Sequence, residues 1–347
     1  MARNKVLLTR EDALAQGQKP TLKTISLMSG LAVPTVSRAL NDAHDIGRDT
    51  KELVRRIAND IGYVPNRAGV RLRTGRTNVV SLVMSTEHDN NTARLISSVA
   101  KGLQGTPFHL NVTPYSPGDD LMKPVHYIVE TRSADAIILN QIEPQDPRVA
   151  YLMEKNFAFA THGRTIWEKQ HAYFDFDNEA FGRNAISLLA ERGRKNVLVV
   201  APPPVQNYSQ HMQAGFSAAA RALDVRLITT NDVNSDCDFQ VIFKAMHAAL
   251  DADQTIDAVV SGSSNAALAA TVAIETTGKS VGQEMDVVSK DSNKFLRTFN
   301  ENILTFPESV ADAGAFLAKA AIQAVKQPHL APMQSLEVPV KVAAYGS

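Results

Sequence analysis

The sequence predicts an α/β fold in which a small helical domain precedes a two-lobed core. Apolar strand runs alternate with amphipathic helical stretches over residues 77–347, and this alternation is typical of parallel sheets covered by helices. Residues 21–64 instead carry the apolar spacing of short helices. At 347 residues the chain is also too long for one ordinary core, so we expect two or three domains or lobes.

The first short helix is predicted to begin at Thr21 and to end at Gly30. Thr21 is a suitable N-cap, and glycine tolerates the positive φ of a sharp turn at a helix end. Between them, three apolar side chains share one helix face: Leu22, Ile25 and Met28.

The second helix, in the stretch VPTVSRALND at positions 33–42, is too short to be stable alone in water. Its proline suits the first helical turn, where a missing N–H costs nothing. An apolar stripe at helical spacing is formed by Val36, Ala39 and Leu40. The remaining face carries polar side chains that have no evident structural use.

The third helix is predicted over residues 48–61, where Leu53, Ile57 and Ile61 recur at every fourth position before Gly62. Helix, glycine-containing turn, short helix and supporting helix make the helix-turn-helix plan. In that plan the outer face of the second helix enters the major groove of DNA, which gives the polar face a purpose. A plain three-helix bundle with a polar face is the alternative.

The charge distribution favours a nucleic-acid partner for this helical domain. The formal net charge of the chain is zero, yet residues 1–76 hold 14 of its 36 Lys and Arg side chains and 7 of its 36 Asp and Glu side chains. A basic domain attached to an acidic body indicates binding to a polyanion such as double-stranded DNA. A chance local surplus of basic residues is the alternative.

The composition disfavours several other classes of protein. No apolar run approaches the roughly 18 residues of a membrane-spanning helix, and residues 1–20 lack the apolar centre of a signal peptide and predict a disordered arm. Cys237 is the single cysteine, so no internal disulfide can form and we expect a cytoplasmic protein. Phosphate-binding glycine loops and zinc signatures are absent, so we expect no cofactor, no metal and no catalytic residues.

Two stretches of the helical region also carry a resemblance. TLKTISLMSGLAVPTVSRALND and GYVPNRAGVRLRTG are similar to the recognition and hinge signatures of the LacI/GalR family of bacterial transcription regulators. The resemblance extends, more weakly, over nearly the whole chain. It implies that Val33, Pro34 and Arg38 read bases, and that Leu72 enters the minor groove. The DNA contacts implied in this way are Thr24, Val33, Pro34, Thr35, Ser37, Arg38, Asn41, Asn66, Arg67, Arg71 and Leu72.

The hinge implied by the resemblance occupies residues 65–76. The segment is basic, short and interrupted by Gly69, so alone it is expected to be mostly disordered. Two copies packed in a minor groove gain phosphate contacts and can push a side chain between base steps. Gly69 departs from the alanine common in the family and raises the cost of ordering. A flexible linker is the alternative.

The core contains at least nine strand runs, which favours two doubly wound parallel sheets over a single sheet. The resemblance implies the same architecture, a periplasmic-binding-protein-like core with a ligand in the cleft. By that analogy the first lobe comprises about residues 77–190 and 308–336. The second lobe comprises about residues 191–307 and 337–347.

Polar side chains gather where the predicted strands end, and open α/β sheets bind ligands beyond the carboxyl ends of their strands. Paired oxygens and a cation suit the hydroxyl groups of a carbohydrate-like or central-carbon metabolite. We predict an effector site formed by Ser85, Thr86, Asn140, His162, Arg164, Asp177, Met212, Ser263 and Asp291.

Three of these positions depart from the family pattern. Met212 stands where the family often has a ligand-holding arginine, and Ser263–Ser264 replace the usual Asn-Asp. Asp291 is kept without the glycine that usually precedes it. We therefore predict that Asp177 and Asp291 are the principal effector contacts and that the effector differs from those of relatives with the arginine.

The sequence thus predicts a homodimeric, effector-controlled transcription regulator that acts as a repressor, with an activator or dual regulator of the same family as the alternative. Two recognition helices are needed because one reads few base pairs, and two-fold symmetry matches a palindromic operator. Two rival classes remain open: a cytoplasmic solute-binding protein and an α/β enzyme, neither with a DNA function. The basic helical domain disfavours the first, and the absence of catalytic motifs disfavours the second.

Overall fold

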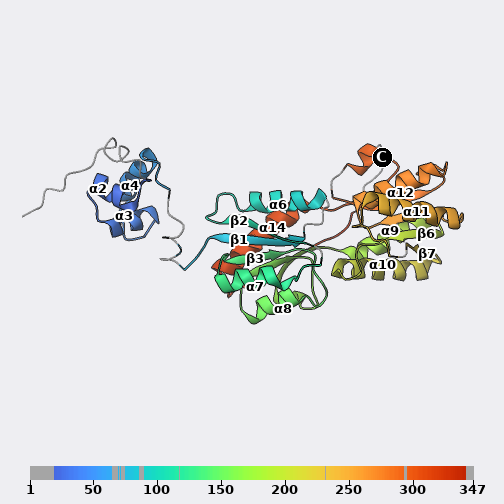
Figure 1. Cartoon of the computed structure of the whole chain (residues 1–347), viewed down its shortest axis with the longest axis horizontal. Helices are drawn as coiled ribbons and strands as arrows, with labels where there is room; N and C mark the ends of the chain where they lie inside the picture. The colour runs from blue at the N-terminus through green and yellow to red at the C-terminus, as the bar shows by residue number, and fades with distance from the viewer. Residues whose placement is uncertain are drawn as a thin grey trace, which may run out of the picture. The chain divides into compact units, whose positions relative to one another are not determined.

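The computed structural model describes residues 19–64, 69, 71, 75–85, 90–116, 118–230, 232–292 and 295–340, except for the side chains of Asn90 and Asn91. The chain divides into two compact units, Met1–Thr77 and Asn78–Ser347, which are described separately (Figure 1). Residues 1–18 of the predicted arm lie outside the described residues, as do four predicted contacts: Asn66, Arg67, Leu72 and Thr86.

The first unit contains the three predicted helices: α2 (Leu22–Ser29), α3 (Val33–Leu40) and α4 (Arg48–Asp60). Helix α2 begins with a capping box. The Thr21 hydroxyl accepts from the Thr24 N–H at 3.3 Å, and the Thr24 hydroxyl accepts from the Thr21 N–H at 3.1 Å. The helix ends at Gly30, whose φ of 72° is the left-handed conformation that the sequence predicts there.

The three helices enclose one small apolar core, formed by Ile25, Val36, Ala39, Val54, Ala58 and Ile61. The inner face of α4 differs slightly from the predicted stripe, because Val54 and Ala58 are buried whereas Leu53 and Ile57 are half-buried. Two adjacent apolar stripes run along this helix, and spacing alone does not decide which one packs inward.

Part of the predicted hinge is described. Gly69 and Arg71 have a helical backbone, and the Gly75 N–H donates to the Arg71 carbonyl at 2.8 Å. The ordering of this segment on DNA stays a prediction.

The first lobe of the second unit is built on a six-stranded parallel sheet in the order β11-β5-β4-β3-β1-β2. Its strands are β1 (Val79–Ser85), β2 (His109–Tyr115), β3 (Ala136–Leu139), β4 (Phe159–His162), β5 (Ala172–Phe176) and β11 (Gln334–Glu337). One face packs on α6 (Asn90–Gly102) and α14 (Val310–Lys326). The other packs on α7 (Met122–Thr131) and α8 (Pro147–Glu154).

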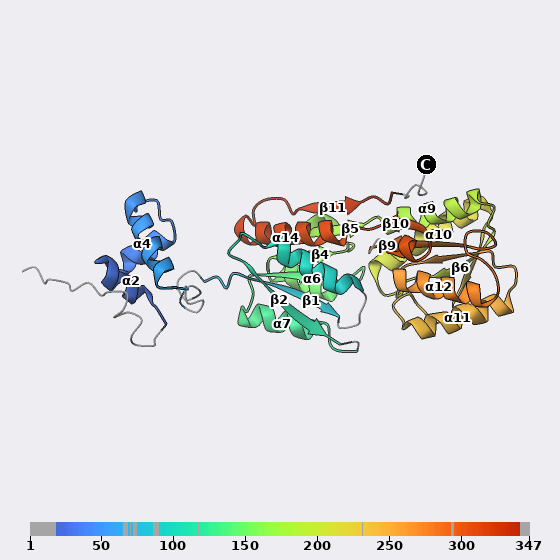
Figure 2. The same ribbon diagram turned by 90° about the horizontal axis from the view of Figure 1, so that it is seen from above.

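The second lobe is built on a five-stranded parallel sheet in the order β10-β9-β8-β6-β7. Its strands are β6 (Asn196–Val200), β7 (Arg226–Thr229), β8 (Ala258–Ser261), β9 (Asp286–Asp291) and β10 (Leu304–Pro307). One face packs on α9 (Asn178–Glu191) and α10 (Asn207–Leu223). The other packs on α11 (Phe239–Ala252) and α12 (Ser264–Thr276), with the short α13 (Leu296–Phe299) nearby. Figure 2 shows the two sheets with helices on both faces, which confirms the predicted fold class.

Helix α9 packs against α10 through a pair of glycines. A Cβ at Gly182 would lie 2.4 Å from the Met212 carbonyl oxygen, and a Cβ at Gly215 would lie 2.2 Å from the Glu179 carbonyl oxygen. The backbones can approach this closely only because both positions lack a side chain. The packing differs from the predicted lobe boundary near residue 190, because α9 belongs to the core of the second lobe.

The same packing corrects one predicted effector contact. The Met212 side chain is fully buried in the apolar core of the second lobe. Its neighbours there include Phe181 and Phe216. Met212 therefore packs α10 onto its own lobe, and the structure does not support a role in holding an effector.

The chain crosses between the lobes after β5 and again after β10. These two connecting segments, called the crossings below, are joined to β11 by hydrogen bonds. The Asp177 N–H donates to the Glu337 carbonyl at 2.8 Å. The Ser309 N–H lies 3.1 Å from both oxygens of the Glu337 carboxylate. The segments between the lobes are thus held side by side by hydrogen bonds. Of the second-lobe tail predicted at residues 337–347, the last seven lie outside the described ranges.

No helix in the described part of the chain is both long and apolar enough to cross a bilayer. The described residues also contain no group of three or more His, Cys, Asp or Glu side chains arranged to hold a metal ion.

Candidate DNA interface and effector site

Helix α3 presents the predicted base-reading side chains on its outer face. Val33 and Arg38 are exposed, with 38% of Val33 accessible, and Pro34 is exposed beside them. Thr35 and Ser37 are half-buried at the edges of this face. Val36 and Ala39 are buried in the core, so the helix is fixed by packing while its outer face stays available. This is the geometry that a recognition helix requires.

Two further predicted contacts also serve the helix ends. The Asn41 amide donates to the Ser37 carbonyl at 2.5 Å, and Asn41 is the C-cap of α3. The Thr24 hydroxyl lies 3.2 Å from the Thr21 hydroxyl within the capping box. Both side chains therefore stabilise helix ends, and their DNA contacts stay predictions. Arg71 is exposed in the hinge segment.

An acidic partner of Arg38 was not predicted from the sequence. The Arg38 guanidinium forms an ion pair with the Asp45 carboxylate, which lies in the turn between α3 and α4. The sequence offered one signal, because Asp45 is an acid in a basic domain only seven positions beyond Arg38.

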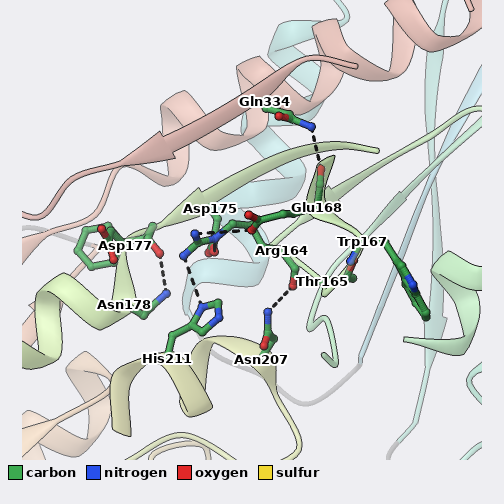
Figure 3. Close-up of polar contacts among 12 residues, drawn as sticks. Arg164, Thr165, Trp167, Glu168, Asp175, Asp177, Asn178, Asn207, His211 and Gln334 are labelled. Atoms are coloured by element: carbon green, nitrogen blue, oxygen red, sulfur yellow. Dashed lines mark hydrogen bonds and ion pairs between the residues drawn. The ribbon is translucent and has the colours of Figure 1, made fainter. Parts of the chain in front are cut away.

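The second unit contains a polar cluster where the two lobes meet, and Arg164 is at its centre (Figure 3). Arg164 follows β4, and its Nε donates to Asp175 Oδ2 at 2.7 Å. Its Nη1 lies 3.8 Å from Glu168 Oε2. Its Nη2 lies 3.5 Å from His211 Nδ1, which belongs to α10 of the other lobe. The guanidinium therefore touches both lobes at once.

Burial and charge pairing set the protonation of this cluster. Burial raises the pKa of Asp175, and the adjacent Arg164 charge opposes the rise. Burial lowers the pKa of Arg164, but the hydrogen bond and charge of Asp175 outweigh it and leave that pKa above its ordinary value. Burial also lowers the pKa of His211, and the Arg164 charge adds to the effect. The neutral imidazole of His211 is thereby favoured.

Asn207, at the start of α10, joins the lobes by two hydrogen bonds. Its side-chain Nδ2 donates to the Arg164 carbonyl at 2.6 Å, and its backbone N–H donates to the Ile142 carbonyl at 2.8 Å. The residue is buried. Figure 3 shows Asn207 and His211 on the same helix, both directed toward the loop that carries Arg164. Asn207 was not predicted from the sequence, because no local pattern links it to acceptors so distant in the chain.

The predicted residues of the first lobe gather at the carboxyl edge of its sheet. The Nδ1 atom of His162, at the end of β4, lies 3.1 Å from Asn140 Oδ1, just after β3. Ser85 is buried at the end of β1. These side chains and Arg164 follow neighbouring strands of one sheet, as predicted.

In the second lobe, two of the predicted residues cap helices and a third lies at the edge of the sheet. Asp177 caps α9 by accepting from the Ala180 N–H at 3.0 Å. Ser263 caps α12, and its hydroxyl donates to the Ser235 carbonyl at 2.9 Å. Asp291 is buried at the end of β9. The capping carboxylate and hydroxyl already have structural partners, so their effector contacts stay predictions.

Lys290 is a further charged residue beside the crossings. Its ammonium lies 3.0 Å from the Glu308 carboxylate and 3.1 Å from Asn178 Oδ1. It also lies 4.9 Å from the centre of the Phe176 ring. One buried cation thus contacts both crossings, and no role for Lys290 was predicted from the sequence.

The loop after β3 is held by a buried ion pair. Arg148 and Asp146 are both fully buried, and Arg148 Nη2 lies 2.6 Å from Asp146 Oδ2. The same nitrogen donates to the carbonyls of Gln141 at 2.8 Å and Asn140 at 3.3 Å. Asp146 also caps α8. The pair thereby shapes the loop that presents Asn140 and the Ile142 carbonyl.

A second buried contact holds the loop that carries Arg164. The His171 ring is buried, with Nδ1 3.3 Å from the Thr161 hydroxyl and Nε2 2.9 Å from the Thr165 hydroxyl. Burial lowers the pKa of His171 from its ordinary value of 6.5. The folded protein therefore favours the neutral ring.

We expect acid to destabilise the fold through His171. The unfolded chain binds a proton at this residue near pH 6.5, whereas the folded chain resists protonation until a lower pH. The stabilisation is complete above pH 6.5 and is lost as the pH falls toward the lowered folded-state pKa, by about 1.4 kcal/mol per unit of difference. Urea unfolding of the wild type and of His171→Gln at pH 7.5 and about 5.5 measures this loss. If the free energy of unfolding depends on pH equally in the two proteins, the expectation is contradicted. His44→Gln, at an exposed position of the first unit, is the control.

A groove of about 450 Å³ lies in the second lobe between α10 and β7. Phe216 and Leu227 form part of its apolar wall, and Asn234 and Gln213 contribute polar atoms. It does not include the Arg164 cluster.

Comparisons with known proteins agree with this architecture. The family profile described as bacterial regulatory proteins, lacI family, matches residues 21–66. The profile described as periplasmic binding protein domain matches residues 128–327. The chain belongs to the lacI family of bacterial regulatory proteins. Its first unit is the lacI-family helix-turn-helix domain, and its second unit is the periplasmic-binding-protein-like core.

Several curated lacI-family regulators are similar over most of the chain. The HTH-type transcriptional regulator CelR of Thermobifida fusca is 27% identical over 283 residues, which are 80% of this chain and 83% of CelR. AglR of Rhizobium meliloti (strain 1021) is 26% identical over 326 residues, which are 91% of this chain and 90% of AglR. RafR of Escherichia coli is 31% identical over 193 residues, 54% of this chain and 57% of RafR.

Solved structures of the lacI family share the fold. The Lac repressor dimer bound to operator and the anti-inducer ONPF superposes with a TM-score of 0.81 at 18% identity, over 94% of this chain and 98% of that one. The CelR–cellobiose complex superposes with a TM-score of 0.66 at 22% identity, over 95% of this chain and all of that one.

Proposed function

We propose that this lacI-family transcription regulator is a repressor that binds a palindromic operator as a homodimer under the control of a small effector. The observation that carries the proposal is the outer face of α3, where an exposed arginine and exposed apolar side chains stand on a helix fixed by its own core. A regulator that binds chromosomal operators acts in the cytoplasm, and the proposal includes that location and a non-enzymatic role.

Each predicted contact has a distinct task in this proposal. Arg38 donates to a guanine edge, whereas Val33 and Pro34 contact the methyl group of thymine. Thr35 and Ser37 contact phosphate or a base, and position the helix in the groove. Contacts from the hinge to the minor groove, through Arg71 and the other predicted residues of 65–76, add affinity and bend the duplex.

The proposed effector binds between the two lobes, at the edge that carries Asn140, His162 and Arg164. These side chains, with Asp175 and Asp291, supply acceptors and donors for the hydroxyl groups of a carbohydrate-like metabolite. The complex of CelR with cellobiose supports this choice of ligand class, because that regulator shares the fold. Met212 is left out of the proposed site because it is buried in the core.

The proposed coupling runs through the relative position of the lobes. An effector that contacts both lobes favours the arrangement in which α10 meets the loops of the first lobe. In a dimer, a change in lobe position alters the separation of the two hinges and so the affinity for operator. The effector changes operator affinity only as far as its own affinities for the two states differ.

A ligand screen tests the effector part of the proposal. We expect the midpoint temperature of thermal unfolding of the full-length protein to rise in the presence of one sugar, sugar acid, sugar phosphate or central metabolite. The same compound is expected to change operator affinity at the concentration that stabilises the protein. A compound that stabilises the protein but leaves operator affinity unchanged contradicts effector control, and turnover of a stabilising compound favours an α/β enzyme instead.

Asn207→Ala is expected to weaken effector binding by about twofold to twelvefold. The substitution removes one buried hydrogen bond between the lobes, which contributes about 0.5–1.5 kcal/mol. The arrangement in which α10 meets the loops of the first lobe is destabilised by that amount. An effector that binds this arrangement loses affinity accordingly. Titration calorimetry with the stabilising compound measures the change. Gln210→Ala, an exposed position on the same helix, is the control, and equal affinities for the two variants contradict the role of Asn207.

A further inference from the structure

The turn between α3 and α4 contains two acidic residues with different partners. Asp42 faces α4, where it forms an ion pair with Arg55 and lies 3.7 Å from Lys51 Nζ. Asp45 instead forms an ion pair with Arg38 on the outer face of α3. The charge of Asp42 therefore faces basic side chains of α4, whereas the charge of Asp45 is placed beside the candidate base reader.

The backbone of the turn brings Asp45 back toward α3. Asp42 has a positive φ of 57°, and the Ala43 N–H donates to the Arg38 carbonyl at 3.0 Å. The Ile46 N–H then donates to the Ala43 carbonyl at 3.2 Å. These contacts fold the chain over the end of α3, so the position of Asp45 is set by backbone hydrogen bonds as well as by its ion pair.

The ion pair is partly open to solvent, with 56% of the Arg38 side chain and 37% of the Asp45 side chain exposed. An exposed pair of this kind contributes little to folding stability. It restricts a long side chain that otherwise samples many rotamers and would lose this freedom on binding a base. The guanidinium has five donors in a rigid fork, and the contact to Asp45 occupies only Nη2, so donors remain for a base edge.

The carboxylate has a second, opposite effect on DNA binding. A negative charge near the interface repels phosphates, and phosphate contacts dominate sequence-independent affinity. Asp45 therefore weakens binding to any DNA while it prepares Arg38 for one base. Orienting Arg38 increases the ratio of specific to non-specific affinity, whereas the repulsion of phosphates lowers both affinities.

We propose that Asp45 is a positioning residue that determines specificity by orienting Arg38 toward a guanine edge, and that its charge lowers affinity for duplex DNA of any sequence. The proposal rests on the base-reading role of Arg38 proposed above. It predicts that Asp45 changes discrimination at one base pair in each half-site, not affinity for operator alone.

The test measures binding of the full-length protein to three duplexes by fluorescence anisotropy. These are an operator selected from randomised DNA by the wild type, the same operator with one base pair replaced, and a scrambled duplex. The replaced base pair is the one at which Arg38→Ala loses discrimination. We expect Asp45→Asn to reduce discrimination at this base pair at least fivefold and to raise affinity for the scrambled duplex about twofold to fivefold. Asp45→Glu is expected to recover part of the discrimination.

Asp60→Asn is the matched control, because it removes one negative charge at the exposed end of α4. It is expected to leave discrimination at the chosen base pair unchanged. In an Arg38→Ala background, Asp45→Asn is expected to have no further effect on that discrimination. Equal discrimination in Asp45→Asn and Asp60→Asn overturns the proposal and leaves Asp45 as a surface charge. If Arg38→Ala alters discrimination at no base pair, the role of Arg38 itself is wrong and the proposal fails with it.

Discussion

Arg148→Met is expected to destabilise the core by about 3–5 kcal/mol, because it leaves the Asp146 carboxylate buried without its partner. Both side chains are fully buried, and the guanidinium also donates to Asp146 Oδ1 at 2.9 Å through Nε. Methionine fills much of the volume but offers no donor to the carboxylate or to the loop carbonyls. The loop has a strained point as well, since Gln141 has a positive φ of 54°.

Urea unfolding of the wild type and Arg148→Met measures the loss. Arg183→Met removes an exposed arginine that pairs with Glu179 one turn away on α9, and is expected to change stability by less than about 0.5 kcal/mol. The double variant Asp146→Ala/Arg148→Met is expected to be less destabilised than the sum of its single variants, because neither charge is then left unpaired. A loss below about 1 kcal/mol for Arg148→Met contradicts this account of the loop.

Arg38→Ala is expected to weaken operator binding by about 1–3 kcal/mol per subunit, or about fivefold to 150-fold per half-site, while binding to scrambled duplex changes only about twofold to threefold. The side chain lies outside the bundle core, so the fold is not affected. Specific contacts are lost, whereas the remaining basic residues still neutralise phosphates.

Anisotropy titrations with the selected operator and with a scrambled duplex measure this difference. Arg48→Ala is the control, because it removes one positive charge from the exposed start of α4, where Arg48 Nε lies 2.8 Å from the Glu52 carboxylate. An equal loss of affinity for both duplexes in Arg38→Ala shows that the residue contacts only phosphate, and no loss removes it from the interface.

The fold followed from the sequence because its signals are local. Thr21 and Gly30 delimit the first helix by capping and by a left-handed turn, and the structure confirms both. In the core, apolar strand runs alternate with helical stretches, which suffices to predict parallel sheets with helices on both faces. These features depend on residues within one element and need no knowledge of its neighbours.

Features that depend on contacts between distant elements were not predictable in this way. The alternation of strand runs and helical stretches does not assign residues 178–191 to a lobe, because their lobe is decided by the close approach of Gly182 and Gly215. The burial of Met212 follows from the same contact. Asn207 is the clearest case, because its acceptors lie in two loops of the other lobe. No periodicity within one segment carries that information.

Parts of the candidate site were nevertheless foreseeable. Asn140, His162 and Arg164 follow neighbouring parallel strands, and such strands end at one edge of a sheet. The position of Arg148 also had a sequence signal. Asp146 and Pro147 form the start expected of a helix, and Arg148 follows them directly in the first turn. Its complete burial required the packing of α8 against the sheet.

The central claim is that paired copies of this chain recognise a two-fold symmetric DNA sequence through α3. Sequencing of genomic fragments retained by the full-length protein, at about 0.15 M salt and with scrambled competitor DNA, tests it most directly. We expect enrichment of an inverted repeat that the wild type retains and Arg38→Ala releases. Retention of no fragment above the scrambled competitor, or of fragments that share no repeat, contradicts it.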